Sequence, residues 1–80
     1  MEYFVKELEF ADSIAYTLDA KCGSVEGFFN VDDYSVTDNG IEIFYESNVF
    51  RINKGWKTFA KDGEGWTIDY GDETICVSIA

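Results

Sequence analysis

After Gly23 the apolar residues recur at every second position, and short turn sequences interrupt the alternation several times. Because successive side chains of a strand point to opposite faces, this period predicts a sheet that is buried on one face. The clearest turn signal is Asp38-Asn39-Gly40, since Asn-Gly favours the type I′ conformation of a two-residue hairpin loop. A loop at Asn39-Gly40 pairs Val36 with Ile43 across the hairpin.

Two more turn sequences flank this hairpin. A loop at Ser47-Asn48 pairs Ile43 with Ile52, and a loop at Asp32-Asp33 pairs Phe29 with Val36. A one-residue slip in any of these registers would turn the apolar side chains to the polar face, so their agreement supports one continuous meander. The predicted core face consists of Phe29, Val31, Tyr34, Val36, Ile41, Ile43, Tyr45, Phe50 and Ile52.

The C-terminal residues predict a separate hairpin. Its loop lies at Gly71-Asp72, and the alternation on either side pairs Ile68 with Ile75 and Trp66 with Val77. Both pairs are apolar, so this hairpin also presents one face to a core.

Residues 53–64, between the two hairpin regions, are ambiguous. Trp56, Phe59 and Ala60 have helical spacing, whereas the run 56–59 also fits a short strand. Both interpretations remain open from the sequence.

The first 22 residues show a different period, because their apolar residues are spaced alternately three and four apart. Gly23 follows as a C-cap, and Lys21 lies where a cation suits the helix dipole. The alternative is a strand over residues 2–10 and a helix that begins at Asp12-Ser13, a fair N-cap. Lys6 breaks the alternation of such a strand, so we prefer the longer helix. Its apolar stripe consists of Met1, Phe4, Leu8, Ala11, Ala15, Leu18 and Cys22.

These patterns predict an α+β fold, in which one N-terminal helix packs on a mainly antiparallel sheet of about six strands. Eighty residues suit a single domain over residues 1–80, and the 18% of aromatic residues can fill its core. No stretch approaches the ~20 apolar residues of a transmembrane helix, and the acidic N-terminus lacks the pattern of a signal peptide. We therefore expect a cytoplasmic protein.

Two cysteines are too few for a disulfide scaffold. Cys22 ends the helical stripe and is expected to face the core. Cys76 alternates with Ile75 and Val77 and is expected to face away from it. The two thiols should therefore remain unpaired.

Charge is the most extreme property of the composition, with sixteen acidic and six basic residues and a net charge of −10. Four of the bases lie between Arg51 and Lys61, a segment without an acid, so the other 69 residues carry two bases and sixteen acids. Such a field repels nucleic acid and anionic lipid and attracts basic proteins. The alternative is that the charge only keeps the protein in solution.

The basic segment interleaves Arg51, Lys54, Lys57 and Lys61 with two aromatic residues, Trp56 and Phe59. Bases and rings in this order can bind single-stranded nucleic acid, but the surrounding negative charge opposes that interpretation. Alternatively, the rings complete the core, or the segment of one copy meets an acidic face of another in a homo-oligomer.

Catalytic chemistry is poorly represented. The chain has no histidine, which removes the commonest general base and transition-metal ligand. Its adjacent carboxylates, Asp32-Asp33 and Asp72-Glu73, lie at expected turns, where acidic residues are usual. No phosphate loop, calcium loop or zinc ligand set is present, so we expect a protein that is not an enzyme and takes no cofactor or metal.

The expected turns and polar strand faces bring acidic residues to the surface, and one aromatic ring points away from the main core among them. These residues form the candidate binding surface, which consists of Asp32, Asp33, Asp38, Glu42, Phe44, Glu46, Asp69, Asp72 and Glu73.

In its size, acidity and lack of catalytic residues, the chain resembles small single-domain inhibitors encoded by phages and mobile elements, such as anti-CRISPR proteins and DNA mimics. The resemblance covers no alignable stretch. It implies a protein of the host cytoplasm whose carboxylates stand in for phosphates and block a basic groove of an effector. The alternative is a small protein–protein interaction module or structural subunit that uses exposed aromatic residues and a sheet edge.

Overall fold

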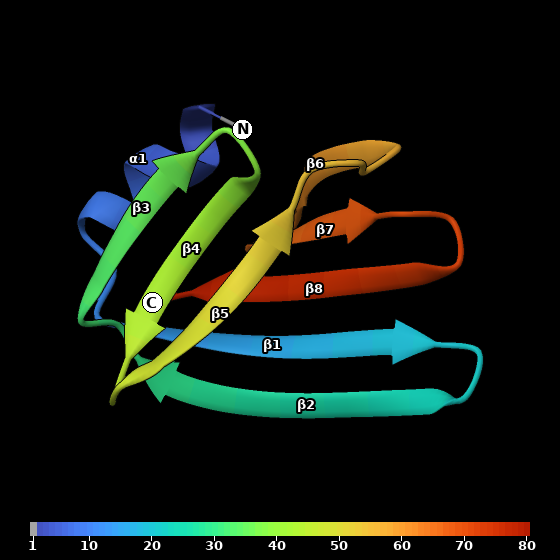
Figure 1. Cartoon of the computed structure of the whole chain (residues 1–80), viewed down its shortest axis with the longest axis horizontal. Helices are drawn as coiled ribbons and strands as arrows, with labels where there is room; N and C mark the ends of the chain where they lie inside the picture. Colours follow the sequence, from blue (N-terminus) through green and yellow to red (C-terminus); the bar gives the residue numbers. More distant parts are fainter. Residues whose placement is uncertain (1) are drawn as a thin grey trace.

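Eight strands follow one short helix in residues 2–80, which the computed structural model describes. They form two antiparallel sheets, one in the order β2-β1-β8-β7-β6 and one in the order β3-β4-β5 (Figure 1). The α+β class with one N-terminal helix is confirmed, whereas the expected sheet of about six strands is wrong. The elements are α1 (Glu2–Glu9), β1 (Ser13–Ala20), β2 (Gly23–Asn30), β3 (Asp33–Thr37), β4 (Gly40–Tyr45), β5 (Asn48–Asn53), β6 (Thr58–Asp62), β7 (Gly65–Asp69) and β8 (Glu73–Ile79).

The predicted long N-terminal helix is wrong, and so is its alternative, a strand followed by a helix. The helix ends at Glu9, and residues 13–20 form the strand β1 between β2 and β8. Ile14, Tyr16 and Leu18 also alternate at a period of two, and pairing on both sides supplies hydrogen bonds that a helix would have to make internally. Gly23 is therefore the first residue of β2 rather than a helix cap.

Other members of the predicted stripe have different environments. Cys22 lies exposed next to Lys21 in the tight β1–β2 turn and does not face the core, and Ala15 is exposed on β1. Met1 lies outside the described residues.

Helix α1 is short, and its stability comes from packing. An isolated helix of eight residues is marginal in water. Phe4 and Leu8, one turn apart, are buried, and the Phe4 ring makes edge contacts with Phe59 at 5.1 Å and Trp66 at 5.5 Å between centroids. The helix thus closes the core beside β6 and β7.

The small sheet contains the two predicted hairpins, with registers that differ by two residues from those predicted. Val36 pairs with Ile41, and Ile43 pairs with Phe50, so the loops are Asp38-Asn39 and Glu46-Ser47. Gly40 is not a loop residue but begins β4 with φ 138°, where an added Cβ would clash with the Ile52 carbonyl oxygen. A shift of two keeps every side chain on its predicted face, although Val36 stays 47% exposed.

The predicted hairpin at Asp32-Asp33 does not form. Phe29 pairs with Ile14 of β1, because the chain leaves the large sheet after β2 and enters the small sheet at β3. The Phe29 ring still faces the core and stacks on Tyr45 of the small sheet at 4.0 Å between centroids. The sequence therefore identified the buried face but not the sheet to which Phe29 belongs.

The C-terminal hairpin has the predicted register, in which Ile68 pairs with Ile75 and Trp66 with Val77. Of the two interpretations of residues 53–64, the short strand is correct, since Thr58–Asp62 pair with β7.

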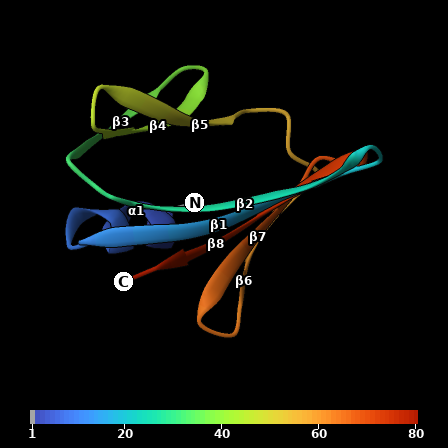
Figure 2. The same ribbon diagram turned by 90° about the horizontal axis from the view of Figure 1, so that it is seen from below.

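The small sheet lies over one face of the large sheet, and the core fills the space between them (Figure 2). We call that face of the large sheet its inner face. No helix within residues 2–80 is long and apolar enough to cross a membrane. The buried core consists of Phe4, Leu8, Ile14, Phe29, Ile41, Ile43, Phe50, Ile52, Trp66, Ile68, Ile75 and Val77.

Candidate functional site

The face of the large sheet that points away from the small sheet, here called the outer face, carries three rows of side chains across its five strands. Each row follows from the strand registers, because residues paired across neighbouring strands point to the same face. From β2 to β6, the rows are Ser24, Asp19, Thr74, Asp69 and Thr58; Glu26, Thr17, Cys76, Thr67 and Ala60; and Phe28, Ala15, Ser78, Gly65 and Asp62.

These rows contain four carboxylates and no lysine or arginine. Asp19 and Asp69 lie in the same row with Thr74 between them, so two strand spacings of ~4.8 Å separate their strands. Glu26 and Asp62 lie on the two edge strands. The acids therefore surround a floor of hydroxyl, thiol and methyl groups.

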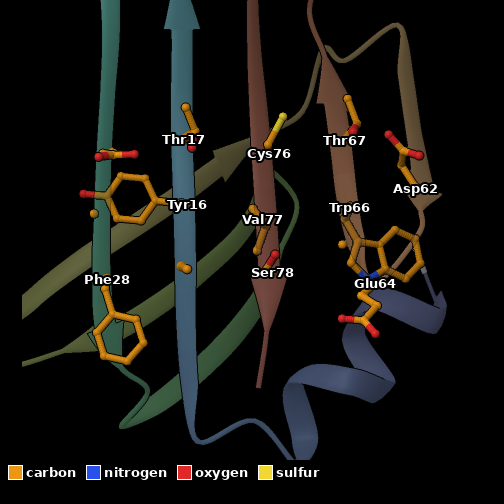
Figure 3. A pocket seen from close by; sticks show the side chains of 14 residues that line it. Tyr16, Thr17, Phe28, Asp62, Glu64, Trp66, Thr67, Cys76, Val77 and Ser78 are labelled. Atoms are coloured by element: carbon orange, nitrogen blue, oxygen red, sulfur yellow. The ribbon is translucent and has the colours of Figure 1, made fainter.

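A shallow hollow of about 710 Å³ crosses this face. Figure 3 shows Thr17, Cys76 and Thr67 projecting from three adjacent strands on its floor, with Phe28 on one side and Asp62 and Glu64 on the other. Phe28 is 68% exposed, so its ring offers apolar contact area beside the acids.

The chemistry of the hollow suits recognition by charge and hydrogen bonding. Carboxylates accept charge-assisted hydrogen bonds from arginine and lysine, and the floor hydroxyls can donate or accept. Within residues 2–80, no group of three or more acidic or cysteine side chains is arranged to hold a metal ion.

No protein-family model, curated protein or solved structure matches this chain. We therefore infer its function from the geometry of its surfaces.

The predicted binding residues are distributed over three separate places. The first group lies where β3 begins beside the β4–β5 turn. There the Asp32 carboxylate accepts a hydrogen bond from the Glu46 N–H at 2.9 Å, and the Asp32 N–H donates to the Phe44 carbonyl. Asp33 pairs with Phe44, whose ring is 37% exposed. These four predicted residues do lie together.

Two other predicted residues of the small sheet do not join them. Glu42 forms an ion pair with Arg51, its cross-strand partner, at 3.0 Å, which neutralises part of its charge. Asp38 lies in the β3–β4 loop at the opposite end of β3.

The third group, Asp69, Asp72 and Glu73, surrounds the β7–β8 turn. The Asp69 carboxylate accepts a hydrogen bond from the Gly71 N–H at 2.8 Å, which stabilises the turn. Figures 1 and 2 place this turn at the other end of the molecule from the β4–β5 turn. Of the nine predicted residues, Asp69 alone has a place in the outer-face rows.

Sequence reasoning missed Asp19, Glu26, Phe28 and Asp62. Asp19 was assigned to a helix, and Asp62 fell in the ambiguous segment. Glu26 and Phe28 alternate with Val25 and Phe29, a signal that would have placed them on a polar strand face.

The basic segment is largely tied to the rest of the protein. Arg51 pairs with Glu42, and Lys61 pairs with Glu7 at 2.8 Å; the same Glu7 oxygen accepts a hydrogen bond from Trp66 Nε1. Trp56 and Phe59 are partly buried against the core and make an edge contact at 5.1 Å. The interpretation that these rings complete the core fits the structure better than stacking on nucleic acid.

Proposed function

We propose that this chain is a non-enzymatic acidic protein that occupies a basic, nucleic-acid-binding surface of an effector protein. The observation that carries the proposal is the base-free outer face, on which Asp19, Glu26, Asp62 and Asp69 surround an uncharged floor. Proteins hold nucleic-acid phosphates mainly with arginine and lysine, and the same side chains form strong hydrogen bonds with carboxylates.

The spacing of the carboxylates supports this use. Asp19 and Asp69 share a row on one face, on strands that are roughly 10 Å apart, so that one basic surface can contact both carboxylates. The exposed Phe28 ring adds an apolar contact at the edge of the face.

The partner in this proposal is a protein with a basic surface, rather than a nucleic acid or a membrane, because the net charge of −10 repels polyanions. The resemblance in size and charge to phage-encoded anti-CRISPR and DNA-mimic inhibitors supports the same class of role in the cytoplasm of a host cell.

A second candidate function is a protein–protein interaction module whose contact surface is the outer face of the small sheet. Asp33, Phe44 and Val49 form one cross-strand row there, and Phe44 is partly exposed beside the acidic turn. In that case the ring, and not the carboxylates of the large sheet, would dominate binding.

Affinity capture from a nuclease-treated host lysate tests the first proposal. The immobilised chain should retain nucleic-acid-binding proteins that duplex DNA and salt release, because salt screens the attraction. The face variant combines Asp19→Asn, Glu26→Gln, Asp62→Asn and Asp69→Asn. The control combines Glu2→Gln, Asp12→Asn, Asp38→Asn and Asp72→Asn at exposed positions away from the rows.

Both variants remove four negative charges, so each has a net charge of −6 instead of −10. We expect the face variant to lose at least tenfold in affinity for the purified partner and the control to lose much less. Equal losses would mean that net charge alone matters. A loss confined to Phe44→Ala would favour the interaction module.

A further inference from the structure

Strand β2 forms one edge of the large sheet and pairs only with β1 among the strands of residues 2–80. The Val31 N–H donates to the Asp12 carbonyl at 3.0 Å. Because hydrogen-bonded and non-bonded positions alternate in an antiparallel ladder, the odd-numbered residues of β2 direct their N–H and C=O groups toward β1. The even-numbered residues, Ser24, Glu26, Phe28 and Asn30, direct theirs away from the sheet.

This edge has few of the features by which proteins usually protect edge strands, since Glu26 is the only charged residue of β2. Short length, proline, lysine and bulges prevent a second strand from pairing with an edge. β2 has eight residues without proline, lysine or arginine, and it pairs with β1 along its whole length without a bulge. Val25 and Phe28 are 61% and 68% exposed on its two faces. The opposite edge strand, β6, has five residues and carries Lys61 and Asp62.

We propose that β2 is a self-association edge, which pairs antiparallel with β2 of a second copy about a two-fold axis at Gly27. The outward-directed groups belong to even-numbered residues, so hydrogen-bonded pairs must join even-numbered positions. The register centred on Gly27 joins Glu26 with Phe28 of the second copy and Ser24 with Asn30 of the second copy.

Charge and overlap select this register among the neighbouring ones. A shift of two residues in one direction places Glu26 opposite Glu26 of the second copy, where like charges repel. A shift in the other direction joins Phe28 with Phe28 but shortens the paired segment. The register at Gly27 pairs residues 24–30 of both copies without a like-charge pair.

The pairing also covers both exposed apolar side chains. Val25 lies on the inner face and meets Phe29 of the second copy, and Phe28 lies on the outer face beside Glu26 of the second copy. The two outer faces then form one continuous base-free surface. This inference does not depend on the proposed function, since it rests on the unpaired backbone groups of β2, whereas the proposed function rests on the carboxylates of the outer face.

Sedimentation equilibrium and disulfide trapping test the proposal. The parent chain should form a dimer that strengthens as salt rises, because screening reduces repulsion between two copies of charge −10. Phe28→Glu should weaken the dimer at least tenfold, because it places a carboxylate opposite Glu26 of the second copy, whereas Ala60→Glu on the β6 edge should leave it unchanged. Circular dichroism confirms that both variants fold.

The register is read out in a Cys22→Ser, Cys76→Ser background. A mixture of Glu26→Cys and Phe28→Cys chains should form a disulfide-linked heterodimer, because hydrogen-bonded partners have Cα atoms about 5.5 Å apart. Each chain alone should crosslink poorly. A chain that remains monomeric at millimolar concentration, or a dimer that Ala60→Glu disrupts and Phe28→Glu does not, would overturn the proposal.

Discussion

The Tyr16 ring of β1 lies over Gly27, its cross-strand partner on β2, so that a Cβ added at position 27 would stand 2.5 Å from the Tyr16 hydroxyl oxygen. An aromatic ring that covers an edge glycine shields the strand backbone from water. The ring is held in place by Phe29 and Phe50, whose centroids lie 6.0 and 4.7 Å away. The absence of a side chain at Gly27 therefore allows the Tyr16 ring to pack against Phe29 and Phe50.

We expect Gly27→Ala to lower the free energy of unfolding by about 1–3 kcal/mol, because the added methyl group forces the ring out of its packed position. Urea denaturation measures the change. In a Tyr16→Val background the same substitution should cost much less, since the overlapping ring is gone. Additive costs in this double-mutant cycle would contradict the packing argument.

The fully buried Ile43 should be among the most sensitive core positions. Ile43→Ala should destabilise the protein by about 2–5 kcal/mol, because it removes buried methyl groups and leaves a cavity. Leu18→Ala should cost less, since Leu18 is half-buried, and Val36→Ala should cost least. Thermal and urea unfolding of the three variants checks this order. An equal loss of unfolding free energy in Val36→Ala and Ile43→Ala would refute it.

The β4–β5 loop has two non-glycine residues in the left-handed region, Glu46 at φ 45° and Ser47 at φ 66°. This conformation costs an L-residue roughly 1–2 kcal/mol, and glycine adopts it freely. Ser47→Gly should therefore stabilise the protein by up to about 1 kcal/mol. Asn39→Gly, in the neighbouring loop where φ is not positive, serves as the control and should give no gain.

Alkaline pH should destabilise the fold through two tyrosines. Burial, followed by the charge of Glu9, raises the pKa of Tyr34, and burial, followed by the charge of Glu73, raises the pKa of Tyr70. A raised pKa in the folded chain contributes stability that is complete below the unfolded value of 10.0 and is lost as the pH rises above it. Urea titrations from pH 8 to about 11.5 should show this loss, and Tyr34→Phe and Tyr70→Phe together should reduce it.

Both cysteines are free thiols, but their environments differ. Cys22 is exposed in the β1–β2 turn, whereas Cys76 is half-buried between Thr17 and Thr67 on the outer face. A thiol reagent should therefore modify Cys22 faster than Cys76 in the native protein. The unfolded, unreduced protein should titrate with two thiols, and fewer than two would contradict the assignment.

The candidate surface was predictable only in part. Asp32, Asp33, Phe44 and Glu46 lie together as expected, because each belongs to the same local meander. Asp19 and Asp69 are 50 positions apart in the sequence and share a row only because β8 pairs with both β1 and β7. A row of this kind depends on strand order, which alternation does not encode.

The sequence by itself determined the local features of this protein. Alternation around a two-residue loop specified the β7–β8 hairpin and its register, and it identified the buried faces of β3, β4 and β5, because a period of two leaves one face for the core. The tertiary structure decided between the helix and the strand that the local pattern leaves open for residues 13–20. The spacing of Ile14, Ala15 and Leu18 fits a helix, and that of Ile14, Tyr16 and Leu18 fits a strand. Pairing with the neighbouring β2 and the distant β8 makes residues 13–20 a strand, because these two strands complete its hydrogen bonds and the small sheet covers its apolar face.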